Sequence, residues 1–183
     1  RKTLSVKIGK VFIGSDHSIK TQSMTTVSTM DTDQSVDEAI RIIEAGGKLV
    51  RFTAPNINEA KNLINIKNAL VAKGYDDPLV ADIHFTPNAA LEASKIVEKV
   101  RINPGNYVDK KKFEVKEYDD ESYQDELLKI EEKFIPLINS CKENGVAMRI
   151  GTNHGSLSDR VMNRFGDTPL GMVESAMEFL RIC

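Results

Sequence analysis

Cysteine is scarce in this chain of 183 residues: only Cys141 and Cys183 are present, far apart in the sequence. Two separated thiols make neither a Cys-x-x-Cys motif nor the disulfide framework that stabilises small secreted proteins. We therefore expect a reducing, cytoplasmic setting.

Long apolar runs are absent too, and no stretch approaches the roughly 18–20 apolar residues of a membrane-spanning helix. No apolar segment follows the basic residues at the start, as it would in a secretory signal peptide. An excess of one charge is also lacking, because 25 basic residues stand against 27 acidic ones, a formal net charge of −2. We expect neither membrane nor nucleic-acid partners, and any anion site must come from the local placement of charge.

What is present is an alternation of short apolar segments with amphipathic ones. Residues 1–14 contain two alternating runs around Gly9, which predict a β-hairpin. Five strands are then predicted, at residues 21–24, 49–53, 79–82, 99–102 and 147–151. Helices are predicted at residues 33–45, 58–73, 87–97 and 126–144, and from 168 to about 183.

Strict alternation of strand and helix is typical of a parallel sheet covered by helices, either a doubly wound sheet or a barrel. No glycine fingerprint for a dinucleotide follows the first strand, which favours the barrel. A complete barrel needs about 250 residues. We therefore predict an α/β fold, an incomplete (β/α)8 TIM-type barrel with about five units over residues 15–183, and the hairpin at its bottom. The polar segment 106–125 is expected to be a solvated excursion.

Such an open barrel would leave the first and fifth strands unpaired on one side. We expect Val50, Val80 and Met148 to face inward and to be partly exposed there. Unpaired strand edges and exposed apolar surface favour association, so a homo-oligomer is predicted.

Polar side chains recur where the predicted strands end. They are Arg51, Asp82 and His84, Arg101 and Asn103, and Arg149, with Asn153 just beyond the fifth strand. Residues two apart in a strand share a face, and barrel active sites lie at the carboxyl ends of the strands. These side chains are therefore candidates for one site.

Three arginines at one mouth repel one another unless an anion or a buried carboxylate accompanies them. The planar guanidinium fork suits phosphate, so a small phosphorylated ligand is the favoured reading. For Asp82 and His84 three roles stay open: a metal site, a structural pair, or contact with ligand and proton transfer.

Several segments together resemble the 4-hydroxy-3-methylbut-2-enyl diphosphate synthase family, and residues 106–134 and 166–172 resemble its longer form from plants and some bacteria. The matching segments are residues 22–25, 50–51, 80–85, 101–106 and 149–157, in the family's order and at its approximate spacing. Each segment is weak evidence alone, and the combination is specific.

The resemblance implies reductive opening and dehydration of 2-C-methyl-D-erythritol 2,4-cyclodiphosphate in non-mevalonate isoprenoid biosynthesis. It implies a [4Fe–4S] cluster in a separate domain and reduced ferredoxin or flavodoxin as electron donor. Arg51, Arg101 and Arg149 would grip the diphosphate. Asp82, Asn103 and Asn153 would shape the contacts to the hydroxyl groups, with His84 supporting them.

The family's cluster-binding cysteine motifs are not found in this sequence, so we expect a truncated, substrate-binding part of the enzyme without a cofactor of its own. Two alternatives stay open. One is a pterin-binding type of barrel synthase, which shares a phosphate mouth, and the other is a non-catalytic anion-binding fragment.

Overall fold

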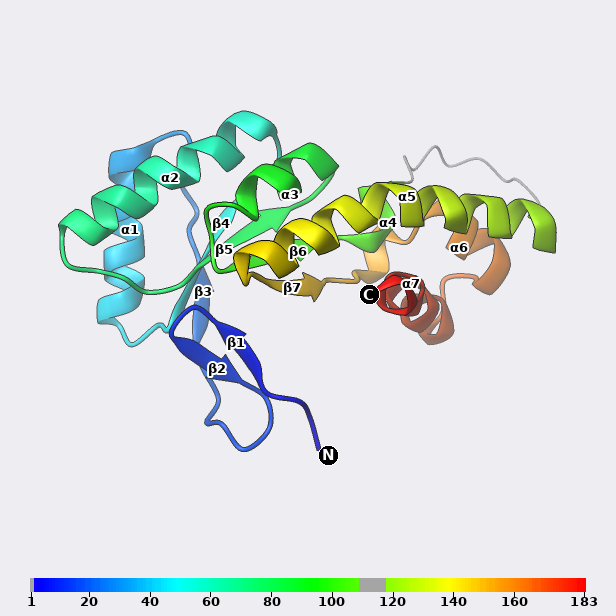
Figure 1. Cartoon of the computed structure of the whole chain (residues 1–183), viewed down its shortest axis with the longest axis horizontal. Coiled ribbons are helices and arrows are strands. Elements are labelled where there is room, and N and C mark those ends of the chain that lie inside the picture. The colour runs from blue at the N-terminus through cyan, green and yellow to red at the C-terminus, as the bar shows by residue number, and fades with distance from the viewer. Residues whose placement is uncertain (1, 109–117) are drawn as a thin grey trace.

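The computed structural model describes residues 2–108 and 118–183 and shows a small hairpin beside a larger parallel sheet (Figure 1). The hairpin pairs β1 (Val6–Ile8) with β2 (Val11–Ile13), antiparallel. The sheet is parallel throughout, in the order β3-β4-β5-β6-β7. Its strands are β3 (Gln22–Met24), β4 (Leu49–Thr53), β5 (Leu79–Ile83), β6 (Lys99–Ile102) and β7 (Ala147–Ile150).

Helices cover one face of this sheet, and α6 and part of α5 extend beyond it (Figure 1). The helices of the described residues are α1 (Thr32–Glu44), α2 (Ile57–Ala72), α3 (Pro87–Ala93), α4 (Pro104–Tyr107), α5 (Asp120–Asn144), α6 (Asp159–Phe165) and α7 (Pro169–Ile182), with a 3₁₀ turn, η1 (His154–Ser156). The main core lies between sheet and helices and includes the fully buried Phe52, Leu63, Ile102 and Phe134. No helix in the described ranges is long and apolar enough to cross a bilayer.

The bounds of several helices differ from those predicted from the sequence. The fourth predicted helix begins at Asp120 and not at residue 126, because the Asp119 side chain accepts a hydrogen bond from the Ser122 amide at 2.8 Å and caps the helix. The third ends at Ala93, before residue 97. The short helices α4 and α6 were not predicted. Of the predicted excursion 106–125, residues 109–117 lie outside the described residues.

The inward face of the sheet differs from the prediction. Val50 and Met148 pack in the core on the helix side, so their assignment to the inward face was wrong. Val80 does face inward, but it is 1% exposed because Ile8 of the hairpin packs over it and Leu49. The hairpin thus covers the apolar part of the inward face.

The hairpin turn sits at the amino-terminal ends of β5 and β6. A Cβ on Gly9 would come within 2.8 Å of the Glu98 side chain and 3.2 Å of Pro78, the residues that precede these two strands. Lys10, next in the turn, forms an ion pair with Asp76. The opposite, carboxyl ends of the strands are left for a site.

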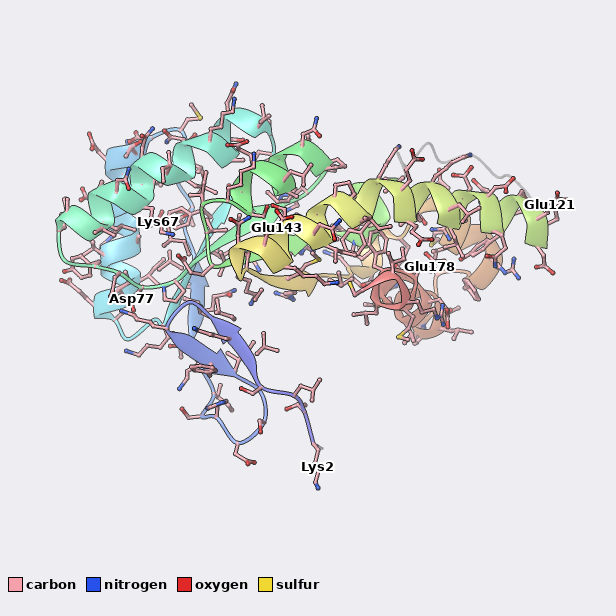
Figure 2. All side chains as sticks on the ribbon, in the orientation of Figure 1. Lys2, Lys67, Asp77, Glu121, Glu143 and Glu178 are labelled. Atoms are coloured by element: carbon pink, nitrogen blue, oxygen red, sulfur yellow. The ribbon has the colours of Figure 1, made fainter. Side chains whose placement is uncertain are left out.

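A buried ionic cluster joins helices α5, α6 and α7 at the end of the molecule away from the hairpin. Arg160 of α6 forms two hydrogen bonds of 2.6 and 2.8 Å with Glu178 of α7, which Figure 2 labels where α7 meets α5. Tyr123 of α5 donates its hydroxyl to the same carboxylate and stacks under the Arg160 guanidinium, 4.7 Å from the ring centroid. This bidentate pair holds α6 and α7 against α5.

Candidate anion-binding site

The strand register places the predicted arginines on one face of the sheet. Thr53, Asp82, Arg101 and Arg149 are neighbours across β4 to β7, and Arg51 lies two residues before Thr53. Side chains in register on parallel strands share a face. This face is opposite the helical core, and these residues sit toward the carboxyl ends of their strands.

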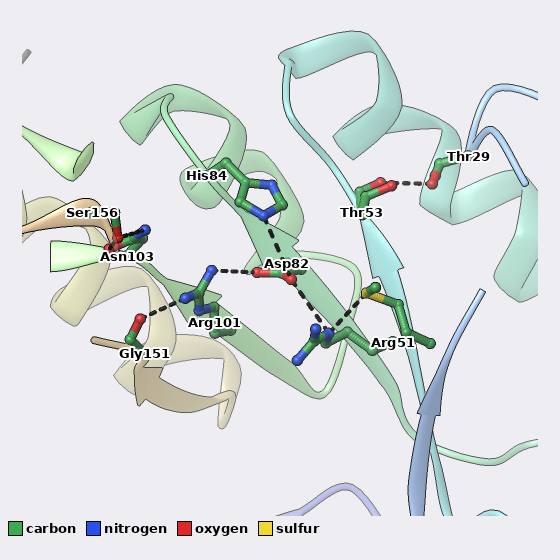
Figure 3. A network of polar contacts seen from close by, with 10 residues as sticks. Thr29, Arg51, Thr53, Asp82, His84, Arg101, Asn103, Gly151 and Ser156 are labelled. Atoms are coloured by element: carbon green, nitrogen blue, oxygen red, sulfur yellow. Dashed lines mark hydrogen bonds and ion pairs between the residues drawn. The ribbon is translucent and has the colours of Figure 1, made fainter. Parts of the chain in front are cut away.

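Asp82 is the centre of the cluster (Figure 3). Its Oδ1 accepts a hydrogen bond from Arg101 Nη1 at 3.0 Å, and its Oδ2 lies 3.3 Å from Arg51 Nε. His84 Nε2 is 3.9 Å from Oδ2, too far for a hydrogen bond. Asp82 is 2% exposed. Its single negative charge is shared by the guanidinium groups of Arg51 and Arg101, and both are held in place by it.

Arg101 has a second fixed partner in the next strand. Its Nη2 donates a 2.5 Å hydrogen bond to the carbonyl oxygen of Gly151, just after β7. A Cβ at position 151 would stand 2.1 Å from Arg101 Nε. Glycine is therefore required there for the arginine to lie across the end of β7.

The loops that follow β6 and β7 are tied together beside this cluster. Asn103 Nδ2 donates to Ser156 Oγ at 2.8 Å (Figure 3), and a Cβ on Gly105 would collide with the Ser156 carbonyl oxygen at 1.6 Å. Asn153 does not join this contact: its Oδ1 accepts the Gly155 amide at 3.1 Å and caps the 3₁₀ turn. The side chains of Asn103 and Asn153 both bond to the loop that follows β7, Asn103 to Ser156 and Asn153 to Gly155.

Arg149 differs from the other two arginines. It is exposed, and among residues 2–108 and 118–183 it forms no hydrogen bond or ion pair. It lies on the strand beside Arg101 with its donors unengaged. Of the three arginines it is the one most open to an incoming anion.

Lys99 is a residue of this face that the sequence analysis did not single out. It is 8% exposed and lies two residues before Arg101 on β6, in register with Val80 and Ala147. Burial lowers its pKa, and the nearby charges of Arg149 and Arg51 lower the pKa further. The period of two along the strand was the signal that could have found it.

The described residues do not form a metal or cluster site. No group of three His, Cys, Asp or Glu side chains in residues 2–108 and 118–183 could hold a metal ion. Cys141 is buried, and burial raises its pKa to about 11. A [4Fe–4S] cluster uses four cysteine thiolates, which two cysteines do not supply, so these residues do not fit that cofactor.

The parallel strands, the helices on one face and the cationic cluster at the strand ends together define a β/α-barrel type of domain. Comparison with known families agrees with this class and makes it specific. A family model described as the GcpE TIM-barrel domain matches residues 3–183, and the chain belongs to this family. The match confirms the predicted incomplete TIM-type barrel and the predicted family.

The relatives carry one name. Proteins of Parabacteroides distasonis, Akkermansia muciniphila and Bacteroides thetaiotaomicron are 59%, 58% and 56% identical to the chain over its whole length. Each is called 4-hydroxy-3-methylbut-2-en-1-yl diphosphate synthase (flavodoxin), so these relatives are enzymes. The chain spans only about 30% of their length.

Among solved structures, a Yersinia pestis DHPS with a pterine-sulfa conjugate is similar to the chain. The TM-score is 0.40 and the identity 16%, over 84% of this chain and 68% of that one. A likeness this low bears on neither fold nor function.

Proposed function

We propose that this chain is the substrate-binding barrel portion of an oxidoreductase that reductively opens and dehydrates 2-C-methyl-D-erythritol 2,4-cyclodiphosphate. The product would be 4-hydroxy-3-methylbut-2-enyl diphosphate, in non-mevalonate isoprenoid biosynthesis. Support comes from the family match over residues 3–183 and from the shared name of relatives at 56–59% identity.

The observation that carries the proposal is the shared carboxylate of Asp82 between Arg51 and Arg101, with Arg149 in register beside them. Two guanidiniums share this carboxylate and a third lies on the same face, so the described residues leave the face with an excess of positive charge. A diphosphate supplies the missing anion and matches the paired donors of a guanidinium.

Asp82 would act on the substrate through the arginines. Because it holds Arg51 and Arg101 before any ligand arrives, their orientation costs little at the moment of binding. Arg149, which has no partner among the described residues, would complete the grip when the anion binds.

The remaining predicted residues would meet the sugar-derived part of the substrate. Asn153 uses its Oδ1 for the cap on Gly155, and its Nδ2, which has no hydrogen bond among the described residues, would donate to the substrate. Asn103 holds Ser156 and would shape the loop more than contact the ligand. His84, whose Nε2 lies 3.9 Å from Asp82 Oδ2 and whose ring is next to the exposed Phe85, would help to position the Asp82 carboxylate.

The reaction needs two electrons, which the [4Fe–4S] cluster of the whole enzyme would supply from reduced flavodoxin or ferredoxin; the relatives' names specify flavodoxin. The residues of this chain do not fit the cluster, as shown above. Its own contribution is to bind, orient and neutralise the diphosphate. A cytoplasmic location stays a prediction.

Of the alternatives, the pterin-binding synthase gains no support from the family match. Titration calorimetry of this chain separates the readings. We expect the cyclodiphosphate and inorganic pyrophosphate to bind with an affinity that falls as salt rises, and a dihydropterin not to bind. Binding of the dihydropterin without the cyclodiphosphate would overturn the proposal in favour of the pterin-type enzyme.

A further inference from the structure

Lys99 occupies a level of the inward face below the Asp82 cluster. It is in register with Val80, which is itself in register with Arg51, and it lies two residues before Arg101. Two residues along a strand correspond to about 6.6 Å. The hairpin residue Ile8 packs on Leu49 and on Val80, the neighbour of Lys99 in register. Lys99 therefore lies beside the apolar residues under the hairpin and one register level below Arg101 and Arg149.

No described group neutralises this lysine. Within residues 2–108 and 118–183, Lys99 forms no hydrogen bond or ion pair, although it is only 8% exposed. Both oxygens of Asp82 are engaged by Arg101 and Arg51. The adjacent carboxylate, Glu98, accepts from Lys67 at 2.6 Å and from the Leu79 amide at 2.8 Å.

A lysine that is largely buried and has no partner among the described residues is costly. The lowered pKa of Lys99 has that physical origin: burial first, then repulsion from Arg149 and Arg51. An anion bound between Lys99, Arg149 and Arg51 would give the ammonium a partner and would offset its repulsion by the two arginines. The arrangement is therefore incomplete without an anionic ligand.

We infer that Lys99 is a fourth cation of the anion site, level with Arg51 and one register level below Arg101 and Arg149, and that it selects two linked phosphates over a single one. The inference rests on the proposed function for the location of the ligand and adds the residue that contacts its deeper phosphoryl group. Four cations, Arg51, Lys99, Arg101 and Arg149, lie on this face, and of these four described residues the Asp82 carboxylate engages only Arg51 and Arg101. A lone phosphate reaches the cations of one register level, whereas two linked phosphates are longer and reach both levels.

The test compares inorganic pyrophosphate with inorganic phosphate by titration calorimetry, using the 183-residue chain and its Lys99→Met and Lys99→Arg variants. The matched control is Lys48→Met, at an exposed lysine immediately before β4 and so at the opposite end of the strands. We expect Lys99→Met to weaken pyrophosphate at least 10-fold and phosphate less than 3-fold. Lys99→Arg and Lys48→Met should stay within about 3-fold of the unmodified chain for both ligands.

The outcomes separate the two proposals. If the unmodified chain binds pyrophosphate and Lys99→Met binds it equally well, the role of Lys99 is wrong and the arginine site stands. An equal loss for phosphate and pyrophosphate overturns the selectivity. If the unmodified chain binds neither pyrophosphate nor the cyclodiphosphate, the proposed function itself fails.

Thermal unfolding without ligand distinguishes a binding residue from a structural one. Methionine has a similar length and no charge, so Lys99→Met removes an unpaired buried ammonium and should leave the melting temperature unchanged or higher. Pyrophosphate should then raise the melting temperature of the variant less than that of the unmodified chain. A variant that melts several degrees lower without ligand would show that Lys99 serves the fold, contrary to the inference.

Discussion

Gly151 and Arg101 are fitted to each other: the glycine carbonyl accepts Arg101 Nη2 at 2.5 Å, and a Cβ on the glycine would stand 2.1 Å from Arg101 Nε. Gly151→Ala should therefore displace the guanidinium from Asp82. We expect a loss of about 1–3 kcal/mol in unfolding free energy, the usual cost of overpacking, and weaker pyrophosphate binding. Gly155→Ala is the matched control, because its nearest neighbour would be 3.8 Å away. Equal behaviour of the two variants in denaturant unfolding and calorimetry would contradict this account.

Asp82→Asn tests whether the carboxylate holds the two arginines. It leaves Arg51 and Arg101 without their shared counter-charge, and breaking a buried pair costs about 3–5 kcal/mol. Because Arg51 is partly exposed, we expect a loss of about 3 kcal/mol, the lower end of that range. Pyrophosphate should replace the missing charge and raise the melting temperature more in the variant than in the unmodified chain. A smaller ligand-induced rise in the variant would argue against an anion bound between these arginines.

The arginines themselves can be tested one at a time. Arg51→Met, Arg101→Met and Arg149→Met should each weaken cyclodiphosphate binding by about 1.5–3 kcal/mol, the scale of a hydrogen bond to a charged group. Arg181→Met is the control, since its partner is Glu174 on the same helix α7. Calorimetry that shows no loss for any of the three would rule out their proposed role.

The sequence was sufficient for the strands of the sheet and for the grouping of the site. Strands β4 to β7 are apolar runs, and their terminal polar residues fall on one face because side chains alternate along a strand. The same rule contradicts the inward placement of Val50 and Met148. Each is the neighbour of an inward arginine, Arg51 or Arg149, and must point the other way.

Other features depend on tertiary contacts that no local pattern records. The helix α6 spans only Asp159–Phe165 and is held by the Arg160–Glu178 pair to a helix further along the chain. The contact of Asn103 with Ser156 joins two segments between which the chain forms α5 and β7. Lys99 begins a predicted strand, and its burial follows from its tertiary neighbours, among them Val80 and Ala147 in the adjacent strands.

The two cysteines should differ in reactivity. Burial raises the pKa of Cys141 to about 11, and Cys183 is exposed. A thiol-titrating reagent at pH 8 should modify Cys183 in the folded chain and Cys141 only after denaturation. Because the folded pKa of Cys141 lies above its ordinary value of 9.0, its contribution to stability is complete below pH 9 and is lost as the pH rises through about 11. Rapid modification of both thiols in the folded chain would contradict the burial of Cys141.

The open edges of the sheet give the last prediction. Strands β3 and β7 each pair on one side only among the described strands, and the three residues of β3 are all exposed. The inward face itself is charged, and its apolar part lies under the hairpin, so association through exposed Val50, Val80 or Met148 is no longer expected.

We still expect the chain to self-associate at micromolar concentration, now through these strand edges, because unpaired edges recruit further strands. Ser23→Lys places a charge on the β3 edge and should reduce the mass measured by light scattering, whereas Ser18→Lys in the preceding loop should not. If Ser23→Lys leaves the assembly intact, the β7 edge carries it. A monodisperse monomer of the unmodified chain with cooperative unfolding would refute the prediction, since it would mean that both edges are protected.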